Sequence, residues 1–117
     1  MDIHLTVGDA VHRGTLLDTP AARDFAALLP LQLTLSDFKG TEKVSDLPAR
    51  LTTAGEPAGA AAAVGDITYY APWGNLAIFY RPFGYSNGLV VLGRLDDGIE
   101  QLSASSGDIP VTIAVAP

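Results

Sequence analysis

Aromatic and acidic side chains gather in the middle of the chain and form its strongest candidate for a binding site. An exposed tryptophan offers a flat apolar surface to a ligand, and tyrosine hydroxyls can fix the ligand's orientation. Successive strand residues point to opposite faces, so only one of Tyr69 and Tyr70 can line a groove while the other faces the core. Trp73 either lines the same groove or folds back and plugs one end of the fold. The predicted ligand-binding residues are Glu42, Arg50, Tyr69, Tyr70, Trp73, Phe79 and Tyr85.

Glu42 is the acidic member of this set and lies between Thr41 and Lys43 in a polar segment. Carboxylates are rarely buried without a partner, so we expect Glu42 to be solvated or paired with Lys43 or Arg50. A carboxylate that instead faces aromatic rings has a raised pKa and can act as a general acid or base. No second carboxylate is linked to Glu42 by sequence, so a glycosidase-type pair is not indicated.

The segment Gly84–Gly88 matches the Gly-Xaa-Ser-Xaa-Gly pattern of a nucleophile elbow. An elbow requires a strand before the serine and a helix after it. Here the apolar strand pattern of Leu89–Leu95 follows instead, and the chain is too short for the hydrolase fold that carries such an elbow. We therefore interpret the match as chance and expect Ser86 and Asn87 to be turn residues.

Composition excludes several classes of function. The chain has no cysteine, which rules out disulfides and thiolate chemistry. His4 and His12 without a third obvious ligand make a poor metal site, so we expect no metal and no cofactor. The net charge of −6 and the scattered basic residues argue against a nucleic-acid partner.

Length and hydropathy favour one domain over residues 1–117, because chains of this size normally hold a single core. The apolar runs are far too short to cross a membrane, and the N-terminus shows neither a basic region nor a long apolar segment. We therefore expect a cytoplasmic protein with no membrane partner.

Alternating apolar and polar residues predict strands through much of the chain. Gly8 and Asp9 join the first two in a hairpin, and the four-residue turn 71–74 joins two others. The predicted strands cover residues 3–7, 11–17, 31–35, 67–71, 75–80, 89–95 and 111–115. Residues 37–50 look like an irregular link or a short helical turn, and 53–65 like a surface loop or a mobile flap.

Two helices complete the pattern. Thr19 and Pro20 suit a helix start, and Pro30 ends the apolar stripe that follows. A second, short helix is predicted after Asp96, which we expect to cap it. With about eight strands, the chain is mainly β, and closing the sheet into a barrel would remove its edges and leave two ends for the helices.

The order of these segments resembles a minimal cyclophilin-like domain, of the small prokaryotic kind without a characterised function. The last of four similar segments is the most specific, because it is similar to the Val-Val-Phe-Gly-Lys-Val-Xaa-Xaa-Gly stretch of cyclophilins. The four are residues 18–28, 65–71, 74–79 and 90–98. The resemblance implies a closed or nearly closed barrel of eight strands with one clear and one short helix at its ends.

Cyclophilins isomerise Xaa-Pro bonds, and the resemblance implies an apolar proline groove with an arginine that weakens amide resonance. The family's Phe-His-Arg motif should fall near residues 41–45, where this chain has no arginine, and Arg50 is the nearest one. The groove tryptophan falls near Gly84 and Tyr85, and the groove histidine near Leu89. The leading hypothesis is therefore a barrel that binds a small molecule or short peptide in an aromatic groove. The alternatives are a weak peptidyl-prolyl isomerase that uses Arg50, and an interaction module that forms a homodimer.

Overall fold

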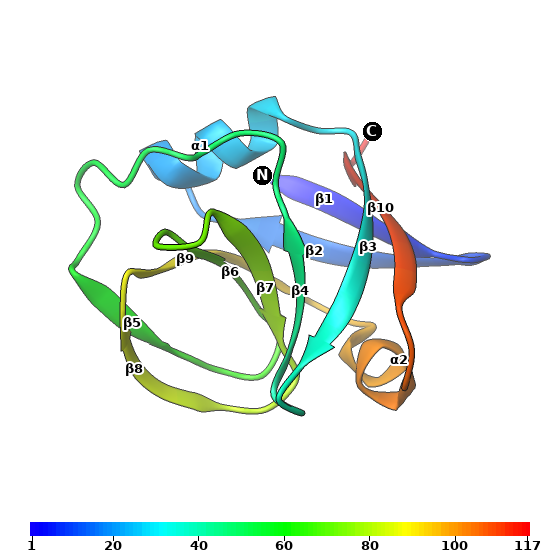
Figure 1. Ribbon diagram of the computed structural model, residues 1–117. Coiled ribbons are helices and arrows are strands. Elements are labelled where there is room, and N and C mark those ends of the chain that lie inside the picture. Colours follow the sequence, from blue (N-terminus) through cyan, green and yellow to red (C-terminus); the bar gives the residue numbers. More distant parts are fainter.

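The computed structural model describes residues 1–117 and is mainly β, with ten strands and two short helices (Figure 1). Eight strands close into an antiparallel barrel in the order β1-β10-β3-β4-β7-β6-β9-β2. Their bounds are β1 Asp2–Val7, β2 Ala10–Leu16, β3 Leu31–Phe38, β4 Glu42–Asp46, β6 Asp66–Tyr70, β7 Asn75–Phe79, β9 Leu89–Leu95 and β10 Ile109–Val115. The predicted eight-stranded barrel is thus confirmed. No helix has the length and apolarity that a membrane span requires.

Inward-facing side chains of every second strand residue fill the barrel. Ile3 and Leu5 of β1 are 1% and 0% exposed, and Leu76 and Ile78 of β7 are both 0% exposed. These residues belong to one core cluster that includes side chains from both helices. Because the barrel interior is packed with side chains, any ligand site must lie on its outer surface or at an end.

Helix α1 (Pro20–Ala27) forms as its sequence predicts. The hydroxyl of Thr19 accepts a hydrogen bond from the backbone N–H of Ala22 at 3.1 Å, and Pro20 takes the first helical position. The apolar face buries Phe25 completely against the barrel. This burial holds a helix that would be too short to persist alone, and α1 closes one end of the barrel (Figure 1).

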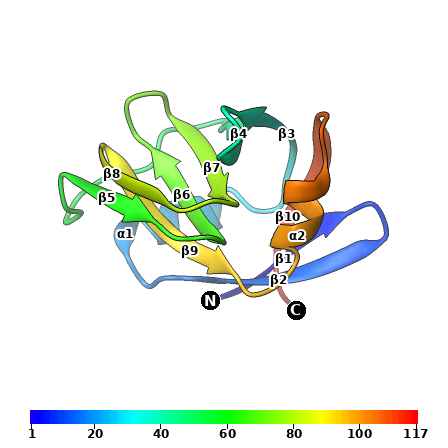
Figure 2. The same cartoon turned by 90° about the horizontal axis from the view of Figure 1, so that it is seen from below.

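Helix α2 (Ile99–Ala104) lies near the opposite end, but Asp96 does not cap it (Figures 1 and 2). Its N-cap is Gly98, which makes no side-chain cap and has φ of 89°. The Asp96 carboxylate instead accepts a hydrogen bond from the Thr15 hydroxyl at 2.9 Å. The predicted cap was wrong because the chain turns tightly at Gly98 before the helix begins.

Segment 37–50 contains strand β4, where an irregular link was predicted. β4 pairs with β3 on one side and with β7 on the other. Its apolar alternation is concealed because Lys43, which is 1% exposed, occupies an inward position that an apolar residue usually takes.

Segments 59–62 and 83–87 form a two-stranded ribbon outside the barrel, β5 (Gly59–Ala62) with β8 (Phe83–Asn87). The prediction of a loop at 53–65 was therefore wrong for residues 59–62, and Ser86 and Asn87 lie in a strand instead of a turn. The small residues of β5 allow a close approach: a Cβ on Gly59 would lie 2.3 Å from the backbone oxygen of Ser86. Figure 2 shows the ribbon standing beside β6, β7 and β9.

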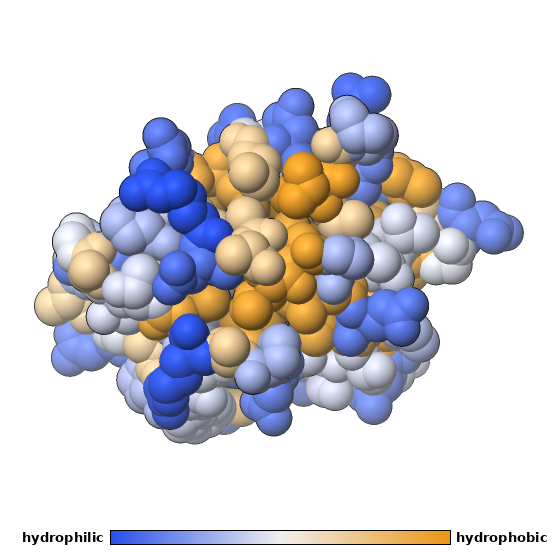
Figure 3. All heavy atoms as spheres, turned by 90° about the horizontal axis from the view of Figure 1, so that it is seen from above, coloured by the Kyte–Doolittle hydropathy of each residue, from blue (hydrophilic) through white to orange (hydrophobic).

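The end of the molecule that carries α1 shows a stretch of apolar surface (Figure 3). Partly buried side chains that pack on the core from this end and its flanks include Leu28, Leu29, Leu31, Leu33 and Leu47. Their exposed portions extend the core outward to the surface.

Candidate ligand-binding site

An apolar pocket of about 150 Å³ lies on the outer face of the barrel, between its strands and the β5–β8 ribbon. An apolar cavity of about 150 Å³ is large enough to hold benzene. We call it the ribbon pocket. Its lining residues are Phe38, Glu42, Val44, Tyr70, Trp73, Asn75, Phe79, Phe83, Ser86 and Leu89.

Strand register explains why these residues meet. Residues directly opposite each other on neighbouring strands share a face of the sheet. Glu42 stands opposite Phe38 on one side and opposite Phe79 on the other, which makes one row across β3, β4 and β7. Tyr70 stands opposite Asn75 and Leu89, which makes a second row across β7, β6 and β9. Both rows face outward, away from the core.

Three aromatic rings form a corner of the pocket. The Trp73 ring lies 5.7 Å from Phe38 at an interplanar angle of 80°, and 5.3 Å from Tyr70 at 85°. These are edge-to-face contacts, which hold rings at right angles. Trp73 is 61% exposed on the β6–β7 turn, so the alternative in which it plugs one end of the fold is wrong.

Phe79 and Phe83 connect the pocket floor to the ribbon. Their ring centroids are 5.8 Å apart, and Phe79 is 1% exposed while Phe83 is 45% exposed. Phe79 packs in a small outer cluster with Ala62, Ala77 and Leu89. Because Ala62 belongs to β5, this second cluster connects the ribbon to the barrel wall.

Glu42 is half-buried in the pocket and takes part in no ion pair. Burial, together with the charge of nearby Asp37, raises the pKa of the Glu42 carboxyl. The expected pairing with Lys43 or Arg50 was wrong. Lys43 follows Glu42 directly on β4, so its side chain points to the opposite face of the sheet.

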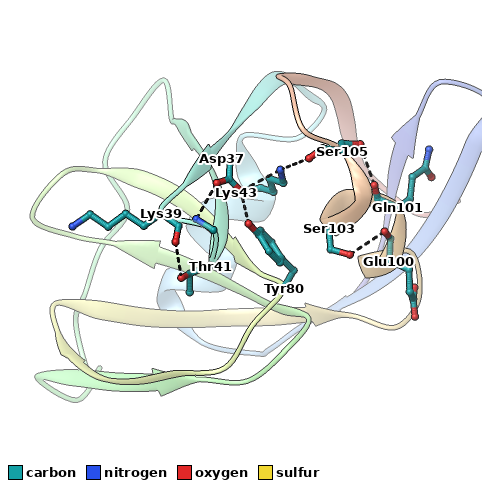
Figure 4. A network of polar contacts seen from close by, with 10 residues as sticks. Asp37, Lys39, Thr41, Lys43, Tyr80, Glu100, Gln101, Ser103 and Ser105 are labelled. Atoms are coloured by element: carbon teal, nitrogen blue, oxygen red, sulfur yellow. Dashed lines mark hydrogen bonds and ion pairs between the residues drawn. The ribbon is translucent and has the colours of Figure 1, made fainter.

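Lys43 belongs to a separate polar cluster at the barrel end that α2 occupies (Figure 4). Its ammonium donates to the backbone oxygen of Ser105 at 2.9 Å and lies 3.3 Å from the Asp37 carboxylate. Tyr80 donates its hydroxyl to the same carboxylate, and this hydrogen bond is the main cause of the lowered pKa of Asp37. The one lysine next to Glu42 in sequence is therefore fully engaged elsewhere.

Asn75 carries the clearest polar signal in the pocket. Its side chain is 6% exposed, and its carboxamide oxygen is buried without a hydrogen-bond partner. Leaving such an acceptor unsatisfied costs about 1–3 kcal/mol. A donor that reached this oxygen would remove the cost, so Asn75 is the lining residue with an unused acceptor.

Four of the seven predicted site residues line the ribbon pocket, and three lie elsewhere. The four are Glu42, Tyr70, Trp73 and Phe79. Tyr69 is the core member of its pair: it is 1% exposed, and its hydroxyl accepts a hydrogen bond from the backbone N–H of Leu51 at 3.2 Å. Arg50 donates to the backbone oxygen of Ala71 at 2.9 Å, and Tyr85 is 64% exposed on the ribbon without lining the pocket.

Sequence reasoning missed six lining residues: Phe38, Val44, Asn75, Phe83, Ser86 and Leu89. Asn75 and Phe79 are four residues apart on one strand and so face the same way, which the sequence pattern could have indicated. Phe83 and Ser86 had no such signal, because β8 lies in the segment that resembled a turn.

The remaining motifs do not form sites. Gly84–Gly88 runs along β8 and then turns into β9, so no helix follows Ser86 as a nucleophile elbow requires. His12 contacts Asp97 and Gln101 between β2 and α2, and the structure brings no three metal-ligating side chains together.

The closed eight-stranded barrel with two helices is the architecture that the resemblance to cyclophilins implied. The family model described as the cyclophilin-like family matches residues 5–114, and the chain belongs to this family. The solution structure of a hypothetical protein from Archaeoglobus fulgidus is similar, with a TM-score of 0.74 at 17% identity, over 99% of this chain and 95% of that one. That likeness is one of fold. No protein of curated function matches the chain.

Proposed function

We propose that this chain binds a small molecule, or one residue of a short peptide, in the ribbon pocket. The observation that carries the proposal is Asn75, a lining residue of an apolar pocket whose carboxamide oxygen is buried without a hydrogen-bond partner. A binding site combines apolar walls with a few placed polar groups, and Asn75 and Glu42 are those groups here.

The aromatic walls support this function. Trp73 is 61% exposed although its neighbours Phe38 and Tyr70 are partly buried. A ligand that covers the indole would bury apolar surface at about 25 cal/mol per Å². The edge-to-face contacts already hold the rings in place, so little side-chain entropy would be lost when a ligand binds.

A titration of the full chain with small aromatic fragments, followed by two-dimensional NMR, tests the proposal. We expect shifts to be confined to the signals of the pocket residues, above all the Trp73 indole and the Asn75 side-chain amide. Tyr85→Ala is the control, because Tyr85 is exposed on the same ribbon but does not line the pocket. Shifts spread evenly over the surface, or none with any fragment, would contradict the proposal.

We further propose that the chain is not an efficient peptidyl-prolyl isomerase. No arginine or lysine is among the pocket-lining residues, and the Arg50 guanidinium is bound to the backbone oxygen of Ala71. Without a cation at the reacting amide, the barrier of about 18–20 kcal/mol stays close to its uncatalysed height. A protease-coupled assay on an Xaa-Pro peptide should show no acceleration; acceleration that disappears in Arg50→Ala would establish the isomerase alternative.

A further inference from the structure

We propose that the ligand of the ribbon pocket is an organic cation, bound by its ammonium or guanidinium group against Phe38, Trp73 and the Glu42 carboxylate, with a second hydrogen-bond donor directed at Asn75. This inference deepens the proposed binding function and rests on it. It names the chemical class that the pocket selects.

The ring arrangement is the first reason. Phe38 and Tyr70 both stand nearly perpendicular to Trp73, so the pocket offers ring faces that point in different directions. A cation within about 6 Å of such a face is attracted by the ring quadrupole. Lys39 illustrates this at the rim, where its ammonium lies 5.3 Å from the Phe38 ring centre without lining the pocket.

The charge balance inside the pocket is the second reason. Glu42 contributes a carboxylate among aromatic rings, and no basic side chain forms an ion pair with it. Lys43 faces the opposite side of β4, Arg50 is bound to a backbone oxygen, and Lys39 sits over the outer ring. Asp37 adds negative charge nearby, as its effect on the pKa of Glu42 shows. The missing partner of Glu42 is therefore a cation, and a neutral or anionic ligand would leave the carboxylate uncompensated.

The positions of Glu42 and Asn75 set the distance between the cation of the ligand and its second hydrogen-bond donor. Glu42 stands opposite Phe79, and Asn75 lies four residues earlier on the same strand, about 13 Å along it. The carboxylate and the carboxamide thus mark opposite ends of the pocket, with Trp73 in contact with the aromatic ring at each end. A ligand that uses both has a cation, an apolar spacer about the size of a benzene ring, and an N–H or O–H donor.

Three probes that share one aminobenzene ring test the inference: 4-aminobenzylammonium, 4-aminobenzyl alcohol and 4-aminobenzoate, each titrated into the full chain at neutral pH and low salt. We expect the cation to bind at least about tenfold more tightly than the alcohol, and the anion most weakly. Glu42→Gln should bring the affinity for the cation down to that for the alcohol. Asp9→Asn is the control, because it removes the same charge from the exposed β1–β2 turn and should leave the preference intact.

The outcomes distinguish failure of the inferred cation selectivity from failure of the proposed binding function. If the alcohol binds in the pocket as tightly as the cation, the pocket binds ligands but is not selective for cations, and the inference is overturned. If the preference is the same in Glu42→Gln as in the wild type, the inference is also overturned. If no probe binds at millimolar concentration, both the inference and the proposed function fail.

Two sources of the cation can be told apart in the same experiment. A blocked peptide, acetyl-Gly-Lys-Gly-amide, presents its ammonium on a flexible chain, whereas 4-aminobenzylammonium presents it on a rigid ring. Tighter binding of the peptide in a Glu42-dependent manner assigns the cation to a lysine side chain, and tighter binding of the aromatic amine assigns it to a free small molecule. Binding of the peptide that does not depend on Glu42 counts against the inference.

Discussion

At Glu42 the fold keeps a carboxylate among aromatic rings without a cation beside it. The pKa of this group is raised in the folded state, first by burial and then by Asp37. A raised carboxyl pKa contributes stability that is present below the unfolded-state pKa and is lost as pH rises through the folded-state value. At neutral pH the ionised group therefore destabilises the fold.

Glu42→Gln should accordingly raise the melting temperature at neutral pH by a few degrees, because it removes a charge that burial disfavours. The gain should vanish in acid, where the wild-type carboxyl is protonated. Thermal unfolding at neutral and at acid pH, followed by circular dichroism, measures this gain in melting temperature. A variant that is less stable than the wild type at neutral pH would mean that Glu42 has a stabilising partner.

Substitution of Trp73 and of Tyr69 by alanine should affect ligand binding and stability differently. Trp73→Ala should abolish ligand binding and change stability by less than about 1 kcal/mol, because the side chain is 61% exposed. Tyr69→Ala should cost about 3–5 kcal/mol, because Tyr69 is 1% exposed and its hydroxyl satisfies the N–H of Leu51. Urea unfolding of both variants tests this pair, and equal losses of stability would contradict it.

How far side chains can be placed from sequence differs from residue to residue. Alternation correctly implied that Tyr69 and Tyr70 face opposite sides, but it could not say which faces inward. That choice depends on the pairing of β6 with β7 and β9, which is a long-range property. The role of Asn75 was invisible for a different reason: an unsatisfied carbonyl is defined only by its full surroundings.

At the scale of elements, one contact between β2 and α2 makes stability depend on pH. The His12 ring lies 2.6 Å from the Gln101 side-chain oxygen and 2.9 Å from the Asp97 carboxylate. These hydrogen bonds, that of Gln101 first, raise the pKa of His12. A raised histidine pKa contributes stability that is fully present below the unfolded-state value of about 6.5 and is lost as pH rises through the folded-state value.

The difference in melting temperature between wild type and His12→Gln should therefore be larger at about pH 5.5 than at about pH 8.5. Taking the difference cancels the titration of groups that the two proteins share. A difference that is independent of pH would show that the contact does not hold protonated His12. Proton NMR of the imidazole measures the pKa directly and serves as the check.

The ribbon that forms one wall of the pocket depends on Gly59. A Cβ there would lie 2.3 Å from the Ser86 backbone oxygen, so Gly59→Ala should push β5 and β8 apart. We expect a loss of about 1–3 kcal/mol and weaker ligand binding. Gly84→Ala is the matched control on the same ribbon, because nothing lies within 4 Å of its Cβ. Equal effects of the two substitutions on binding would argue against the ribbon as a pocket wall.

The elements that the sequence predicted well are those with local signals. The cap of α1 was predicted correctly, and the strands with apolar alternation lie within two residues of their true bounds, except β3, which extends three residues beyond the predicted end. β4 and the ribbon were not predicted. Lys43 breaks the apolar alternation of β4, and glycine and alanine make up β5 of the ribbon. Such strands exist through their neighbours, and only tertiary pairing selects them.

In the whole molecule, the barrel and the ribbon have different structural roles. Eight strands close on themselves and enclose one core, which leaves the ribbon free to form a second, small cluster on the outer wall. The resemblance of four segments to cyclophilins was enough to predict the barrel, which the strand order confirms. The family match confirms the resemblance itself. The resemblance could not predict which residues line the ribbon pocket, because they come from six separate strands and a turn.

Binding in the ribbon pocket is tested most directly by the place at which a bound ligand lies on the protein. Intermolecular nuclear Overhauser effects should be measured between 4-aminobenzylammonium and the full chain. We expect contacts to the rings of Phe38 and Tyr70 and to the methyl groups of Leu89, all of which line the ribbon pocket. Contacts to Leu47 and Arg50, in the shallow groove on the other side of the Trp73 turn, would contradict it.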